Sequence, residues 1–289
     1  MKIEDIALTL IPKISARAIA HLTAVFGSAE AVYAASFEQL TQRGELCEAV
    51  AKAIVEGCGI AQARQIAEQC SRRNVEIVTA AAGEYPQRAR FVEEHPHIIY
   101  MVGNHSLLHS SLLCAFTGDD HSATPYGDKM TVALVSQLAE KAPEAIVVAD
   151  MDNILGRVAI SCALRYSLRC VGVVSAPLWS LEMGNGGSLE KDILMRGGAL
   201  ISQAVVEDGD RMPHYNLVAA VADGVVAVEG HKVPAVAQCA DGMHRTLMAV
   251  PGRVTDMLSR GTNKMIATNM AQMIASGSQI VTYLEFGEC

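Results

Sequence analysis

Short apolar runs alternate with helix-like segments from about residue 114 onward, and this alternation constrains the fold more than any other feature of the sequence. Each run has the length of a strand, and helical periodicity appears between several of them, for example over 129–141 and 157–167. Strands that alternate with helices form βαβ units, so we expect a Rossmann-like, doubly wound, mostly parallel α/β sheet. The expected strands are CAFTG, AIVVAD, CVGVVSA, ALISQAVV, GVVAVEG, TLMAVPG and QIVTYL, which begin at residues 114, 145, 170, 199, 224, 246 and 279.

The first eighty residues show helical periodicity instead. Apolar residues recur at helical spacing over 3–10, 16–26, 49–54 and 61–70, with Ser28 and Ser36 at expected N-cap positions, and a short strand is expected at 75–80. The segment 10–36 resembles a helix-hairpin-helix (SAM-like) element in which Lys13-Ile14-Ser15 replaces the glycine-containing turn. Such a turn can bind phosphate through its N–H groups, but the missing glycines favour a packed helical module. We expect a helical N-terminal domain over 1–80, a connector over 81–110 and a Rossmann-like domain over 111–289.

Composition narrows the class of protein. The eight cysteines are scattered and form no CxxC pair, which favours reduced thiols in a cytoplasmic protein. The N-terminus has no signal-peptide pattern, and no apolar run reaches the length of a membrane span. The net charge is −8, and residues 81–289 hold twenty-two acidic and fifteen basic side chains. Any nucleic-acid surface is therefore expected to be local, because this charge balance argues against a large basic face.

Several segments follow one another in an order that resembles the DNA-processing family DprA, also called Smf. They are Glu84-Tyr85-Pro86, HIIYMVGN from residue 97, CAFTGDDHSATPYG from 114, GGALISQ from 197, LVAAVADGVVAVEG from 217, RTLMAVPG from 245 and RGTNKMI from 260. The run Ala249 to Gly252, followed by Gly261 and Asn263, is the most specific of these. The resemblance extends over nearly the whole chain.

The resemblance implies a non-enzymatic protein that binds single-stranded DNA during DNA uptake, transformation and recombination. It also implies a homodimer formed through the Rossmann domain and hand-off of the strand to a RecA-type recombinase, with no cofactor, no metal, no catalytic residue and no membrane partner. The side chains and backbone amides expected to contact DNA are Gly118, Ser122, Tyr126, Gly127, Lys129, Arg157, Asn216, Arg253, Arg260 and Lys264.

Four departures from the family pattern affect the expected phosphate site. Gly118-Asp119-Asp120 replaces a Gly-Ser-Arg triplet, and the second loop reads Ala149-Asp150-Met151-Asp152 where the family has Ser-Gly. His214-Tyr215-Asn216 replaces Arg-Asn-Arg, and His231-Lys232-Val233 replaces Ser-Gly-Ser. Since carboxylates in a strand-to-helix turn repel phosphate, we expect weak DNA binding, mainly by Arg253, Arg260 and Lys264. Two alternatives stay open: a degenerate paralogue that acts as a scaffold, and a binder of small phosphorylated ligands or nucleotides.

Two further groups have more than one interpretation. Asp119, Asp120, His121 and Asp128, with Asp150 and Asp152 at the next strand end, could form an oxygen-rich site for Mg²⁺ or Ca²⁺, or could be solvated loop acids, the interpretation we favour. The glycine cluster 184–188 could be an anion-binding nest, but a loop with Ser188 as a helix cap is the favoured interpretation. We place His95 and His97 on a surface loop.

Overall fold

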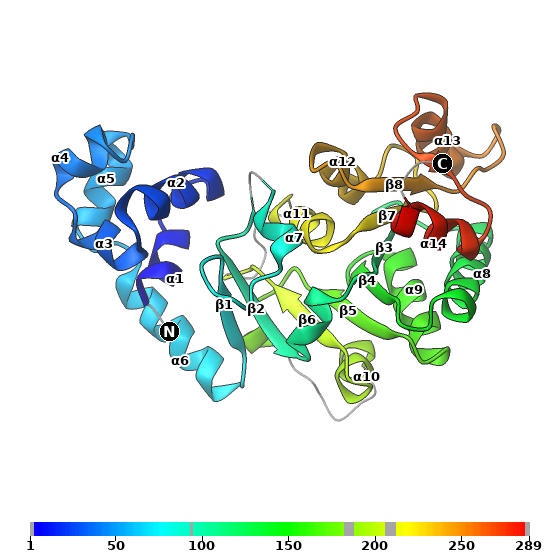
Figure 1. The fold of residues 1–289 in the computed structure, drawn as a ribbon, viewed down its shortest axis with the longest axis horizontal. Helices are drawn as coiled ribbons and strands as arrows, with labels where there is room; N and C mark the ends of the chain where they lie inside the picture. Colours follow the sequence, from blue (N-terminus) through cyan, green and yellow to red (C-terminus); the bar gives the residue numbers. More distant parts are fainter. Residues whose placement is uncertain (1–2, 93–94, 182–187, 206–211, 287–289) are drawn as a thin grey trace.

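The computed structural model describes residues 3–92, 95–181, 188–205 and 212–286. It shows a helical module, defined as α1–α6, at one end of an elongated molecule whose remainder is built on one sheet (Figure 1). Ser15, Ser28 and Ser36 each accept a hydrogen bond from the backbone three residues later and so cap three of these helices. The helices of the module are α1 (Ile3–Thr9), α2 (Ala16–Phe26), α3 (Ala29–Ala34), α4 (Phe37–Gln42), α5 (Glu48–Val55) and α6 (Ile60–Arg72).

The sheet has nine strands in the order β1-β2-β6-β5-β4-β3-β7-β8-β9. All strands from β6 to β9 in this order run parallel, whereas β2 pairs with β6 and β1 pairs with β2 in antiparallel registers. The expected doubly wound, mostly parallel α/β fold is therefore confirmed. The interval 81–110, expected as a connector, contributes β2 to the sheet. The strands are β1 (Glu76–Thr79), β2 (Ile98–Gly103), β3 (Leu113–Thr117), β4 (Ile146–Asp150), β5 (Arg169–Val173), β6 (Ala199–Ser202), β7 (Gly224–Ala227), β8 (Thr246–Ala249) and β9 (Gln272–Met273).

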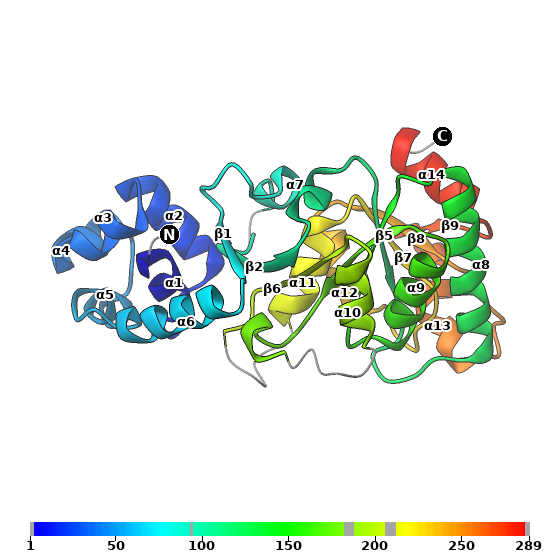
Figure 2. The same ribbon diagram turned by 90° about the horizontal axis from the view of Figure 1, so that it is seen from below.

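Helices cover both faces of the sheet (Figure 2). In β4, Val147 packs into the core on one face and Val148 into the core on the other, which explains why the central strands read as continuous apolar runs. No helix of the described residues is both long enough and apolar enough to cross a membrane. The remaining helices are α7 (Gln87–Arg90), η1 (His105–His109), α8 (Pro125–Lys141), α9 (Ile154–Arg165), η2 (Leu178–Ser180), α10 (Leu189–Met195), α11 (Met212–Val221), α12 (Ala235–Gly242), η3 (Met257–Ser259), α13 (Arg260–Ala267) and α14 (Gly277–Phe286).

The prediction that QIVTYL forms the last strand is wrong, because these residues lie in α14. Ile280 is fully buried, and Leu284 packs against the same core, which is the spacing of one helix face. Gln279 accepts hydrogen bonds from the N–H groups of Ala275 and Ser276, and the N–H of Gly277 donates to Gln137 on α8 at 2.8 Å. Packing on α8 thus overrides the strand preference of the β-branched and aromatic residues.

The placement of His97 on a surface loop is also wrong. The residue is 7% exposed, and Nε2 lies 3.0 Å from Oδ1 of Asp5, a buried carboxylate on α1. This pair joins the helical module to the segment that leads into β2.

Candidate nucleic-acid interface

The order of the strands along the chain reverses between β3 and β7, and ligands of doubly wound sheets bind at such a reversal, outside the carboxyl ends of the strands. Gly118, Asp119 and Asp120 follow β3 directly, and Glu229 stands two residues after β7. The N-terminus of α8 opens onto the same place, because Thr124 is its N-cap. We call this region the switch point.

Glu229 occupies the switch point with its own carboxylate. The residue is 2% exposed, and its carboxylate accepts hydrogen bonds from the N–H of Thr124, at 3.0 Å, and from the Thr124 hydroxyl. Gly127 leaves room for it, since a Cβ at residue 127 would lie 2.1 Å from Glu229 Oε2. A helix N-terminus attracts anions through its free N–H groups and its dipole. In this chain, a buried side chain of the protein supplies that anion.

Asp119 closes the turn after β3. Its carboxylate accepts hydrogen bonds from the N–H of His231 at 3.1 Å, the N–H of His121 at 3.2 Å and the hydroxyl of Ser122 at 3.1 Å. Partial burial raises the pKa of Asp119, but these hydrogen bonds favour the charged form more strongly, so the net pKa lies below its ordinary value. The turn after β3 is thereby tied to the loop after β7.

The turns after β3 and β4 are also locked together. The Asn153 amide donates to the carbonyl oxygens of Gly118, at 3.3 Å, and Asp119, at 3.1 Å, while its oxygen caps α9 by accepting from Gly156. A Cβ at Gly118 would lie 2.5 Å from the Leu155 side chain. Gly118 therefore serves close packing, and its turn already has internal hydrogen-bond partners.

Exposed cations and apolar side chains gather beside the switch point, on the segment from β8 to α13. Arg253, Arg260 and Lys264 are exposed, and so are Val254 (87%) and Met257 (52%). Arg260 and Lys264 lie one turn apart on α13. The Asn263 side chain holds both the N–H and the carbonyl of Gly252, at 3.0 Å each, which keeps the residue before Arg253 against α13.

Tyr126 connects this segment to the switch point. The residue is 41% exposed on the first turn of α8, and its hydroxyl donates to the carbonyl of Pro251 at 2.7 Å. We define the cationic patch as Tyr126, Arg253, Val254, Met257, Arg260 and Lys264. It combines charge for phosphates with an anchored aromatic ring, and such rings stack with nucleic-acid bases.

The structure brings only some of the expected DNA-contact residues together. Gly118, Ser122 and Gly127 lie at the switch point, where they serve Asp119, Glu229 or close packing. Lys129 is exposed on α8 one turn after Pro125. Arg157 is engaged elsewhere, because it donates to Glu190 at 2.9 Å and to the Met151 carbonyl at 3.2 Å.

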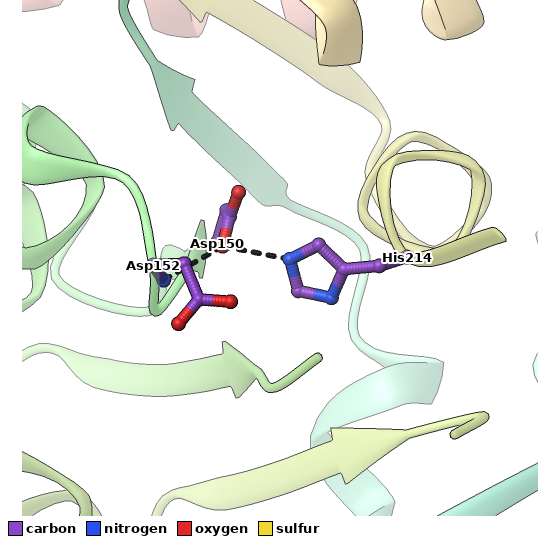
Figure 3. Close-up of side chains that lie close together, drawn as sticks. All are labelled: Asp150, Asp152 and His214. Atoms are coloured by element: carbon purple, nitrogen blue, oxygen red, sulfur yellow. Dashed lines mark hydrogen bonds and ion pairs between the residues drawn. The ribbon is translucent and has the colours of Figure 1, made fainter. Parts of the chain in front are cut away.

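Asn216 lies half-buried on α11, which carries none of the residues of the patch. Its neighbour His214 faces the end of β4, where Asp150 and Asp152 lie (Figure 3). Among the acids considered as one metal site, Asp119 accepts hydrogen bonds from backbone N–H groups, whereas Asp150 and Asp152 lie close to His214.

Ser188 caps α10 as expected, by accepting from the N–H of Lys191, while residues 184–187 of the glycine cluster lie outside the described residues.

Sequence reasoning missed Glu229 and Thr124. Glu229 is the second-last residue of the expected strand GVVAVEG, and Thr124 precedes Pro125, which is a favoured first residue of a helix. These signals predict a helix start and a strand end. Their pairing requires the parallel β3–β7 register, which local sequence does not reveal.

Comparison with known proteins supports the fold described above. The family model described as DNA recombination-mediator protein A matches residues 76–285. The solved structure of DNA processing protein A (DprA) from Streptococcus pneumoniae has a TM-score of 0.75 at 14% identity and covers 99% of each chain. That of DNA processing protein A from Helicobacter pylori has a TM-score of 0.61 at 22% identity and covers 73% of this chain and 96% of its own. No curated protein matches the sequence.

Proposed function

Because the chain belongs to the family of DNA recombination-mediator protein A, we propose that it is a non-enzymatic protein that binds single-stranded DNA through the cationic patch. The Helicobacter pylori relative binds single-stranded DNA, which supports this class of ligand. The observation that supports the proposal is that Arg253, Arg260 and Lys264 are exposed on the segment that the Tyr126 hydroxyl bonds at Pro251. Backbone phosphates would meet the cations, and a base would stack on the ring.

We propose that binding is weak for a protein of this kind. The α8 N-terminus, which in a phosphate-binding sheet would face the ligand, is already served by Glu229. Asp119 adds a second carboxylate at the same place, so a phosphate there would meet repulsion rather than free N–H groups. The cations of the patch then provide most of the attraction.

The wider role follows from the family. We propose that the protein acts in recombination and transformation, as a homodimer that passes the strand to a RecA-type recombinase. Binding the strand and passing it to a recombinase require no catalytic residue, metal or cofactor in this chain.

The test is the affinity for a fluorescent oligo(dT), measured by anisotropy at two salt concentrations. The Arg253→Ala, Arg260→Ala and Lys264→Ala variants should each bind more weakly. Each lost phosphate contact should reduce the slope of log affinity against log salt by about 0.7. Base preference should stay unchanged, because phosphate contacts carry no sequence information. Lys141→Ala is the matched control: it is exposed on the same helix as Tyr126 but about 22 Å along it.

One observation favours a second candidate function, a scaffold that binds protein partners without DNA. The buried Glu229 carboxylate takes the place of a phosphate at α8, as expected of a chain that no longer uses this site. The two candidates differ in the same titration. A scaffold would leave oligo(dT) unbound at low salt, and all three alanine variants would behave like the parent protein.

A further inference from the structure

The imidazole of His214 lies buried at the edge of the sheet and points at two carboxylates (Figure 3). The residue is 4% exposed, and Nε2 lies 2.7 Å from Oδ1 of Asp150. Despite this short contact, neither ring nitrogen has a partner in hydrogen-bond geometry among the described residues. A buried polar group without a hydrogen bond is costly, so this ring needs an explanation.

Both carboxylates are held by the fold. Asp150 is the last residue of β4, a central strand, and is 1% exposed. Its Oδ1 accepts the N–H of Asp152 at 2.7 Å, and the hydroxyl of Ser175, just after β5, donates to Oδ2 of Asp152. The Arg157 guanidinium fixes the Met151 carbonyl between them. Three sequence segments, the ends of β4 and β5 and the first turn of α11, thus meet here.

The charges of Asp150, Asp152 and His214 together favour binding of a cation. Two of these three residues are carboxylates, and the more buried one, Asp150, contacts the imidazole of the third, His214. Buried charges in proteins are paired or coordinate metals. No Lys or Arg among the described residues forms an ion pair with Asp150.

The donor atoms have the spacing of a metal site. One atom from each of Asp150, Asp152 and His214 can be chosen so that all three lie within 4.8 Å of one another. Tetrahedral ligands at Zn–N and Zn–O distances of about 2.1 Å are separated by about 3.4 Å. On metal binding, the 2.7 Å contact between Asp150 and His214 would therefore widen slightly. The separations between Asp152 and the other two ligands would contract, and rotation of the exposed Asp152 side chain permits this.

We propose that Asp150, Asp152 and His214 bind one divalent transition-metal ion. An imidazole nitrogen with two carboxylate oxygens suits Zn²⁺ and its neighbours better than Mg²⁺ or Ca²⁺, which prefer all-oxygen ligands. The exposed side of Asp152 leaves a path for entry and a coordination position for water. The ion would join the carboxyl end of β4 to the first turn of α11.

The first experiment titrates Zn²⁺ into the full chain by calorimetry, with Mg²⁺ as the comparison ion. The exposed thiols Cys47 and Cys58 are replaced by serine beforehand, because they are competing zinc ligands at the surface. We expect one Zn²⁺ per chain and a melting temperature about 5–10 °C higher at a hundredfold excess over Kd. Asp150→Asn and His214→Gln should each weaken binding at least a hundredfold, and Asp152→Asn at least tenfold.

His231→Gln is the matched control, since this exposed histidine lies at the same sheet edge but outside the group. Circular dichroism without metal shows which variants are folded. If the buried substitutions unfold the chain, the exposed Asp152→Asn carries the comparison. Crystals soaked in Zn²⁺ should show an anomalous peak about 2.1 Å from His214 Nε2. No stoichiometric uptake, unchanged affinity in folded Asp152→Asn, or a peak only at other histidines would overturn the proposal.

Discussion

Replacing Glu229 with glutamine removes the negative charge at the N-terminus of α8 and keeps the volume of the side chain. The glutamine oxygen can still accept the N–H of Thr124, and its amide can donate to the Thr124 hydroxyl, which then turns its own proton away. The substitution therefore tests the charge of residue 229 rather than its packing against Gly127.

The expected loss of stability follows from the contacts. A carboxylate in a buried geometry at a helix N-terminus contributes up to about 2 kcal/mol. Each hydrogen bond to a charged group is worth about 1 kcal/mol more than a neutral one. A neutral amide is easier to bury than a carboxylate, which offsets part of both terms. We expect Glu229→Gln to lower the free energy of unfolding by about 1–2 kcal/mol, or Tm by about 3–6 °C.

Urea unfolding followed by circular dichroism measures this change. Glu140→Gln is the matched control, because Glu140 is exposed in the last turn of the same helix, where a negative charge opposes the dipole. That variant should be unchanged or slightly more stable. Glu229→Gln should also bind oligo(dT) about twofold to fivefold more tightly, since it removes a negative charge from the positive end of α8.

Two results would refute the reasoning. If Glu229→Gln is as stable as the parent protein, its carboxylate does not serve as the anion of the α8 N-terminus. If stability falls but DNA affinity stays the same, the switch point takes no part in binding, and the cationic patch acts alone.

Three other predictions concern the same turn and the helical module. Asp119→Ser combined with Asp120→Arg should strengthen oligo(dT) binding markedly by anisotropy; no gain in a folded protein would contradict the repulsion argument. Asp119→Asn should be less stable than the parent protein at pH 7. Because the folded-state pKa lies below the ordinary 3.8, the difference should shrink as pH falls below about 4 in urea titrations. Lys13 has φ +65°, so Lys13→Gly should raise the unfolding free energy by up to about 1 kcal/mol, whereas Lys13→Ala should give no gain in thermal unfolding.

The sequence predicted the parts of this fold that depend on local pattern. Buried parallel strands read as apolar runs, and serines at helix starts predicted caps that the structure contains at residues 28 and 36. The helix α14 was mistaken for a strand because Ile280, Val281 and Tyr283 prefer strands. A capping signal was nevertheless present, since Ser276 is followed three residues later by Gln279, whose side chain accepts the Ser276 N–H.

The site was predicted less well, because its contacts join segments far apart in the chain. Glu229 and Thr124 are 105 residues apart, and they meet only when β7 pairs with β3. Asp150 and His214 meet only where α11 crosses the end of β4. Residue type identified Asp119 and the exposed cations as relevant, but whether each carboxylate faces solvent, a backbone N–H or a histidine depends on tertiary packing.

The antiparallel pair β1–β2 has a consequence for how this protein resists aggregation. β2 contains Ile98, Ile99, Tyr100 and Met101, all buried, and its outer backbone edge is covered by β1. β1 makes a poor template for another chain, because it is only four residues long and its first residue, Glu76, is exposed and charged. A chain shortened to begin at residue 81 would present the apolar edge of β2 to solvent. The expected outcome is edge-to-edge association of such chains, so β1 protects the sheet as well as extending it.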